Sequence, residues 1–196
     1  MNRLNNICVY CGSSPGRSDD YLSMANALAR VLVDHDIGLV YGGASIGLMG
    51  RLADEVLQRG GRVIGVIPEA LAAKEIAHPN LTALHITQSM HERKQLMAEL
   101  ADGFIALPGG IGTLEELFEI WTWAQLGFHR KPCGLLNAAG YYDALIGFLD
   151  HMLEQGFVQA THRKMLMVAS DPDVLLDRLS RYQAPVVEHW IDAEQS

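Results

Sequence analysis

Positive charge is scarce in this sequence. The 196 residues carry 15 Lys and Arg against 23 Asp and Glu, a formal net charge of −8 with a pI near 5.4. No basic face is therefore expected, and nucleic acid and anionic membranes are excluded as expected partners. A small phosphorylated ligand remains compatible, because a local pocket can be positive inside an acidic protein.

Long apolar runs are also missing. No run approaches the roughly 18–20 residues that a helix needs to cross a bilayer, so no membrane span is expected. The polar residues 1–6 lead directly into a strand and do not resemble a secretory signal. The three cysteines are an odd count, which fits a reducing compartment. We expect a cytoplasmic protein.

Metal-ligand spacing is absent as well. Cys8 and Cys11 form a C-x-x-C pair, but redox pairs sit at helix starts and zinc pairs normally need a second pair of ligands. On a predicted strand, residues three apart face opposite sides, so we interpret both as ordinary buried thiols. His91-Glu92 begins like H-E-x-x-H, but residue 95 is Gln. We predict neither a metal nor a cofactor.

What the sequence does contain is an alternation of strands and helices. Strand-like runs fall at 7–10, 38–41, 62–67, 104–107, 133–136 and 166–168. Helical patterns fall at 19–34, 48–59, 90–100, 113–126, 141–155 and 172–182. The alternation predicts an α/β fold, a mainly parallel, doubly wound sheet with helices on both faces. We expect one domain over residues 1–183 and a polar tail over 184–196.

Three loops rich in glycine or serine follow predicted strands, at 12–14, 42–47 and 108–113. Ligands of such sheets bind beyond the carboxyl ends of the strands, so we expect all three loops to converge there. No G-x-G-x-x-G follows the first strand and no G-x-x-x-x-G-K-[ST] occurs, which argues against the dinucleotide and P-loop classes.

The middle loop, residues 42–50, has two open interpretations. Its glycines allow the backbone to approach a ligand closely, or they make a tight strand-to-helix turn. The loop also spells G-x-S-x-G around Ser45, the pattern of a serine nucleophile. No downstream Asp and His stand out as its partners, so a serine hydrolase is not favoured, and Ser45→Ala would test it.

The most informative segment is 104–116, an apolar strand, a Pro-Gly-Gly turn and a helix opening at Thr113. The first N–H groups of a helix have no internal partners and lie at the positive end of its dipole, so this turn predicts a phosphate site. Glu116 would then stand near the sugar. The alternative is a capping box, in which Thr113 caps the helix and Glu116 bonds back to its start.

Two cations open the preceding helix. Arg93 and Lys94 lie at the positive end of the helix dipole, which disfavours cations, and they repel each other. A charge cluster that is exposed to solvent can tolerate this cost. A bound phosphate would turn this cost into a gain, so both are candidate ligand contacts.

The helix predicted at 113–126 is apolar around much of its circumference. One face should pack on the sheet, and the remainder would be exposed unless a second copy covers it, so we predict a homodimer through this helix. Thr122 lies about 120° around the helix from Glu116. If both touch the ligand, the ligand is extended or one contact comes from the partner subunit.

Residues 108–116 match the P-G-G-x-G-T-x-x-E signature of the Lonely Guy (LOG) family of cytokinin riboside 5′-monophosphate phosphoribohydrolases. The resemblance extends over most of the chain. It includes the segments 11–14, 42–43, 47–50, 90–94, 123–127 and 140–142. It implies a Rossmann-like dimer that cleaves the N-glycosidic bond of a nucleoside 5′-monophosphate and releases the base and ribose 5-phosphate.

Carried over residue by residue, the resemblance implies that Arg93 and Glu116 are the catalytic pair. The implied and inferred nucleotide contacts are Gly12, Ser13, Gly43, Glu75, Arg93, Lys94, Gly110, Ile111, Gly112, Thr113, Leu114, Glu115, Glu116 and Thr122. The expected partner is a small nucleoside monophosphate. The alternative class is a nucleotide-binding protein with the same cradle and no turnover.

Overall fold

The computed structural model describes residues 3–73 and 77–186. Over these residues the strands are β1 Asn6–Tyr10, β2 Gly38–Tyr41, β3 Val63–Pro68, β4 Ala83–Thr87, β5 Gly103–Ala106, β6 Cys133–Leu136 and β7 Leu166–Ala169. The helices are α1 Asp19–Asp34, α2 Gly47–Gln58, α3 Glu69–Ala72, α4 Met90–Leu100, α5 Ile111–Leu126, α6 Asp143–Glu154, α7 Ala160–Arg163 and α8 Pro172–Ser180, with a 3₁₀ turn η1 at Ala138–Gly140.

The seven strands of the described residues form one parallel sheet in the order β4-β3-β2-β1-β5-β6-β7. The chain builds outward from β1 to β4, then returns to the other side of β1, where Cys8 pairs with Phe104 of β5. The order therefore reverses between β1 and β5, and ligands of such sheets bind beyond the carboxyl ends of the strands at this point. The predicted α/β class is confirmed.

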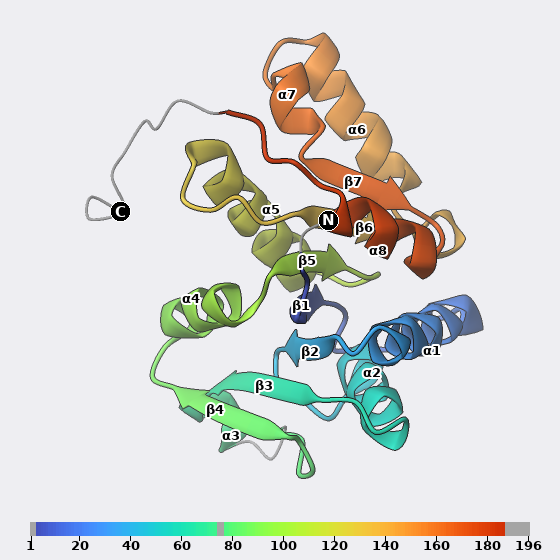
Figure 1. Ribbon diagram of the computed structural model, residues 1–196, viewed down its shortest axis with the longest axis vertical. Helices are drawn as coiled ribbons and strands as arrows, with labels where there is room; N and C mark the ends of the chain where they lie inside the picture. Colours follow the sequence, from blue (N-terminus) through green and yellow to red (C-terminus); the bar gives the residue numbers. More distant parts are fainter. Residues whose placement is uncertain (1–2, 74–76, 187–196) are drawn as a thin grey trace.

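Helices cover both faces of the sheet (Figure 1), with α1 and α2 on one side and α4 and α5 on the other. Alternate residues of each strand feed the two cores: Ile7 and Val9 pack with α1, α2 and α8, whereas Cys8 and Tyr10 pack with α4, α5 and α6. Both faces of the inner strands are buried, which explains their nearly continuous apolar sequences.

The sequence did not predict β4, α3, α7 or η1. Strand β4 lies at the edge of the sheet, and Leu84 and Ile86 are 39% and 49% exposed. A strand that is open on one edge does not need the continuous apolar run by which the other strands were recognised. The short helices α3 and α7 have four residues each, too few to show a helical period.

The predicted environment of the cysteines is confirmed. Cys8 and Cys11 are buried free thiols in the cores on opposite faces of the sheet, and Cys133 is also buried and free. Burial raises the pKa of all three thiols well above its usual range. No helix in residues 3–73 or 77–186 has both the length and the apolar character to cross a membrane.

Candidate active site

The three glycine loops meet at the carboxyl ends of the central strands, as predicted. The N–H of Gly12, after β1, donates to the carbonyl of Pro108 after β5 at 3.0 Å. The carbonyl of Gly12 accepts the N–H of Leu48, at the start of α2, at 3.1 Å. Gly47 packs so closely on Ser13 that an added Cβ would collide with its main chain. One loop thus links the other two.

Helix α5 begins at Ile111 and presents an open N-terminus. Its N-cap residue, Gly110, has an extended backbone, and no side-chain hydrogen bond caps the helix. The space where a Cβ of Gly110 or Gly112 would lie is empty to 4 Å, and Ile111 is 87% exposed. The first N–H groups of the helix and the positive end of its dipole therefore border open space, an arrangement suited to an anion.

The capping-box interpretation of Thr113 and Glu116 is wrong. Because α5 begins two residues earlier than predicted, Thr113 is its third residue and is 4% exposed. Its hydroxyl lies beside Gly109, where a Cβ would collide with it. Glu116 is therefore one turn too far into the helix to bond back to its start.

Glu116 instead pairs with Arg93 of α4. Arg93 Nη2 lies 3.2 Å from Glu116 Oε1, and the two side chains are 10% and 11% exposed. Burial raises the pKa of the Glu116 carboxyl, and the positive charge of Arg93 opposes that rise. The arrangement holds a largely desolvated carboxylate close to the N-terminus of α5.

Arg93 is fixed by more than its ion pair. Its Nε donates to the carbonyl of Val66 at 3.2 Å, and its Nη1 lies 3.6 Å from the Met90 sulfur. Gly42 makes room for it, since a Cβ there would collide with Nη2. The sequence pointed to this glycine loop and included Gly42 in the resemblance, but it gave Gly42 no role in the site. A glycine packed against a buried cation can be recognised only when the helix carrying the cation is placed.

Lys94 points to the α5 side of the site. Its Nζ lies 2.6 Å from Glu115 Oε1 and 2.9 Å from Glu119 Oε2. Desolvation lowers the pKa of the Lys94 amine, but hydrogen bonds to the two carboxylates outweigh it and raise that pKa. Lys94 therefore bridges α4 and α5.

The other predicted contacts occupy different settings. Ser13 is exposed, whereas Gly43 is buried with φ +74 and accepts the N–H of His78 at 2.9 Å. Thr122 is exposed on α5, and its hydroxyl donates to the carbonyl of Phe118 at 2.7 Å. Leu114 is partly buried. Glu75 lies outside the described residues.

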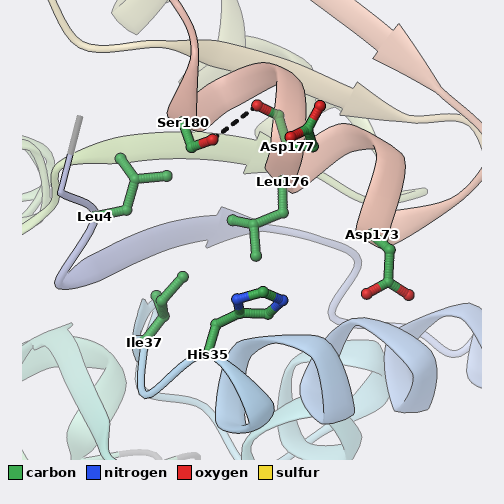
Figure 2. A pocket seen from close by; sticks show the side chains of 7 residues that line it. All are labelled: Leu4, His35, Ile37, Asp173, Leu176, Asp177 and Ser180. Carbon is green, nitrogen blue, oxygen red and sulfur yellow. Dashed lines mark hydrogen bonds between the residues drawn. The ribbon is translucent and has the colours of Figure 1, made fainter. Parts of the chain in front are cut away.

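Two further features bear on alternative sites. Within the described segments, no three or more His, Cys, Asp or Glu side chains are grouped so that they could hold a metal ion. A pocket lies at the opposite, amino end of the strands, lined by Leu4, His35, Ile37, Asp173, Leu176, Asp177 and Ser180 (Figure 2). Both of its carboxylates are paired, Asp173 with Arg30 at 3.2 Å and Asp177 with Arg181 at 2.7 Å.

Known proteins match this chain over most of its length. A family model described as "Possible lysine decarboxylase" matches residues 49–179. A cytokinin riboside 5′-monophosphate phosphoribohydrolase of Rhodococcoides fascians is 49% identical over 166 residues, 84% of each chain. Another, of Arabidopsis thaliana, is 46% identical over 181 residues, 92% of this chain and 85% of that one.

Solved structures agree in fold. The molybdenum cofactor carrier protein of Chlamydomonas reinhardtii has a TM-score of 0.66 to this chain at 22% identity, covering 90% of this chain and 98% of that one. At that identity the likeness establishes the Rossmann-like α/β architecture alone.

Proposed function

The chain belongs to the family of cytokinin riboside 5′-monophosphate phosphoribohydrolases, and we propose that it hydrolyses the N-glycosidic bond of adenosine 5′-monophosphate or an N6-substituted form of it. The products are the free base, a cytokinin or adenine, and ribose 5-phosphate. The observation that carries the proposal is the buried Arg93–Glu116 pair beside the open N-terminus of α5.

The phosphate binds at the glycine turn. The N–H groups from Gly110 to Thr113 and the Thr113 hydroxyl are the donors that a phosphate requires, and the exposed Ile111 and the empty space beside Gly112 leave it room. Anchoring the phosphate there fixes the ribose so that C1′ faces Glu116. The other two glycine loops border the same phosphate site through Gly12, Ser13 and Gly43.

Glu116 acts at C1′. As the bond from C1′ to the base breaks, its electron pair leaves with the base and the sugar gains oxocarbenium character. The Glu116 carboxylate stabilises that charge and takes a proton from the water whose oxygen bonds to C1′. Arg93 holds Glu116 ionised. The proton that the base acquires balances the one that Glu116 removes from water.

Lys94 and its neighbours on α5 form the remaining contacts. The Lys94 amine, which bridges Glu115 and Glu119, is a further cation that can pair with the substrate phosphate. Leu114, Glu115 and Thr122 then border the nucleotide.

We also propose a cytoplasmic homodimer in which residues 1–183 act as one domain. The dimer would cover the outer face of α5, where Leu114, Phe118 and Trp123 are only partly buried. Three buried free thiols suit a reducing compartment. Light scattering after gel filtration measures the mass.

Lysine decarboxylation, which the family description names, fits the residues poorly. That chemistry normally uses a lysine that forms a Schiff base with pyridoxal phosphate. Lys94 is held by two carboxylates, and Lys131 donates to the carbonyl of Ala98 at 2.7 Å. Neither amine is therefore set up to form that Schiff base.

One assay separates the enzyme from a nucleotide-binding protein without turnover. Purified protein is incubated with AMP and, separately, with isopentenyl-AMP, and free base and ribose 5-phosphate are quantified. Release of both products in equal amounts supports the hydrolase. Thermal stabilisation by AMP without release of base supports simple binding. The ratio of the two rates gives the base preference.

A further inference from the structure

Three consecutive carbonyl oxygens of the turn after β5 are each held by a donor from elsewhere in the chain. The Leu107 carbonyl accepts the Tyr142 hydroxyl at 2.6 Å. The Pro108 carbonyl accepts the Gly12 N–H at 3.0 Å. The Gly109 carbonyl accepts the Tyr141 hydroxyl at 2.5 Å. Two of these three donors are adjacent tyrosines that follow β6.

Holding these oxygens orients the N–H groups of the turn. In a planar trans peptide the N–H of the next residue points away from the carbonyl oxygen. The Tyr141 hydroxyl on the Gly109 carbonyl therefore directs the Gly110 N–H to the opposite side. Glycine has a wide choice of backbone conformations, so a Pro-Gly-Gly turn needs such external ties to keep its donors aligned.

The segment that carries the tyrosines is itself built into an unusual shape. Ala139 and Gly140 have φ of +49 and +71, and Ala139 is one of few non-glycine residues in that region. The Asn137 side chain holds the turn, because its oxygen accepts the Tyr142 N–H and its nitrogen donates to Asp143, both at 2.7 Å. The left-handed conformation of Ala139 therefore belongs to the turn that places the hydroxyls of Tyr141 and Tyr142.

The two tyrosines differ in exposure. Tyr142 is 2% exposed and belongs to the core, so its loss would disturb folding. Tyr141 is 42% exposed, and its ring packs edge-on against Tyr21 and Tyr142 at centroid distances of 5.6 and 4.9 Å. The ring contacts fix the position of the Tyr141 side chain. Among the hydrogen bonds described, its hydroxyl makes one, to the Gly109 carbonyl.

We propose that Tyr141 is a positioning residue that sets the affinity of the glycine turn for phosphate by orienting the Gly109–Gly110 peptide. The inference rests on the proposed function, since the phosphate belongs to the same substrate. It adds a residue outside the signature of 108–116. Tyr141 acts through the turn and on binding, whereas Glu116 acts on the bond that breaks.

The test is Tyr141→Phe, which removes one oxygen and keeps the ring. We expect KM for AMP and the inhibition constant of ribose 5-phosphate to rise about tenfold, the loss of about one hydrogen bond, with kcat within about twofold. The inhibition constant of free adenine, which carries no phosphate, should not change. Tyr21→Phe is the matched control, the same change one ring away, and should leave all four constants unaltered.

Several results overturn the inference. Unchanged KM and unchanged ribose 5-phosphate inhibition in Tyr141→Phe would do so. If the inhibition constants of adenine and ribose 5-phosphate rose equally, or if Tyr21→Phe caused the same losses, the effect would come from general packing and not from the Tyr141 hydroxyl. Failure of the proposed function is a separate outcome, recognised by wild-type protein that releases no base. Calorimetric binding of AMP to wild-type and Tyr141→Phe protein then still decides the role of Tyr141.

Discussion

Arg93 and Glu116 lie on consecutive helices of the chain and meet 3.2 Å apart, nearly buried. Helix α4 leads into β5 and α5 leaves it, so the strand and its Pro-Gly-Gly turn decide where the two helices stand. The same turn supplies the open helix N-terminus. A charge pair and an anion site are thus positioned by one short segment, and their separation cannot change without moving it.

Replacing Glu116 by Gln tests the catalytic role. Glutamine keeps the size and a hydrogen-bonding oxygen toward Arg93 but cannot take a proton from water. We expect kcat with AMP to fall by about 100-fold or more, a typical contribution of a positioned base, while the dissociation constant of AMP changes little. Product release and calorimetry on the same protein measure the two quantities.

The control for this variant is Glu99→Gln, an exposed glutamate on α4 whose carboxylate accepts from Gln95. This variant should retain wild-type turnover, and it measures the effect of neutralising a surface charge. A Glu116→Gln protein with full kcat would remove Glu116 from the mechanism and leave nucleotide binding as the function of the site.

The pH dependence follows from the raised pKa of Glu116. The carboxylate is the active form, and burial raises its pKa, so kcat/KM should fall on the acid side at a higher pH than an ordinary glutamate would give. Arg93 opposes the rise. In Arg93→Gln the residual activity should therefore decline at a still higher pH. A profile of log kcat/KM against pH for both proteins measures the two limbs, and an Arg93→Gln limb at lower pH would contradict the assignment.

Gly42 offers a test of geometry without touching either charge. An added Cβ would collide with Arg93 Nη2, so Gly42→Ala should push the guanidinium from Glu116. A displacement of about 1 Å can cost up to about 100-fold in rate, and we expect at least a tenfold loss of kcat/KM. Gly147→Ala on α6, where a Cβ meets nothing within 4 Å, is the matched control. Equal rates for the two variants would show that the Arg93 position is not critical.

Much of the fold could be predicted because the inner strands are buried on both faces. The apolar runs at Gly38–Tyr41 and Cys133–Leu136 coincide with β2 and β6. Ala83–Thr87 escaped notice because an edge strand with exposed Leu84 and Ile86 does not need such a run. Convergence of the three loops followed from topology, since parallel strands that return to the sheet end at one edge.

The details of the site could not be predicted from local sequence patterns. Thr113-x-x-Glu116 and Ser89-x-x-Glu92 both spell a capping box. Only in the second does the hydroxyl residue cap its helix: Ser89 accepts the Glu92 N–H at 3.1 Å, while Glu92 accepts the N–H of Gln88, the residue before the cap, at 2.8 Å. Which candidate caps a helix depends on where the helix begins, and in α5 the extended Gly110 decides that. The tie from Tyr141 to Gly109 joins residues 32 positions apart and has no local signal.

Thr122 tests whether the active site is shared between two subunits. It stands about 9 Å along α5 from Glu116 and about 120° around it, on the face that we propose is covered by the partner. We expect Thr122→Ala to raise KM for AMP about fivefold through loss of a hydroxyl contact. A gel-filtration mass should stay unchanged, because the change removes only one hydroxyl and one methyl group from the proposed interface.

Mixing subunits then tells which subunit supplies the contact. In a heterodimer of Glu116→Gln and Thr122→Ala, a contact made across the interface leaves one site with an intact glutamate and an intact threonine. The other site lacks both, so half of the wild-type activity with wild-type KM should be recovered. A contact within one subunit leaves every site defective, and the mixture would show only the raised KM of Thr122→Ala. Because the two outcomes differ in KM, incomplete mixing cannot imitate the shared site.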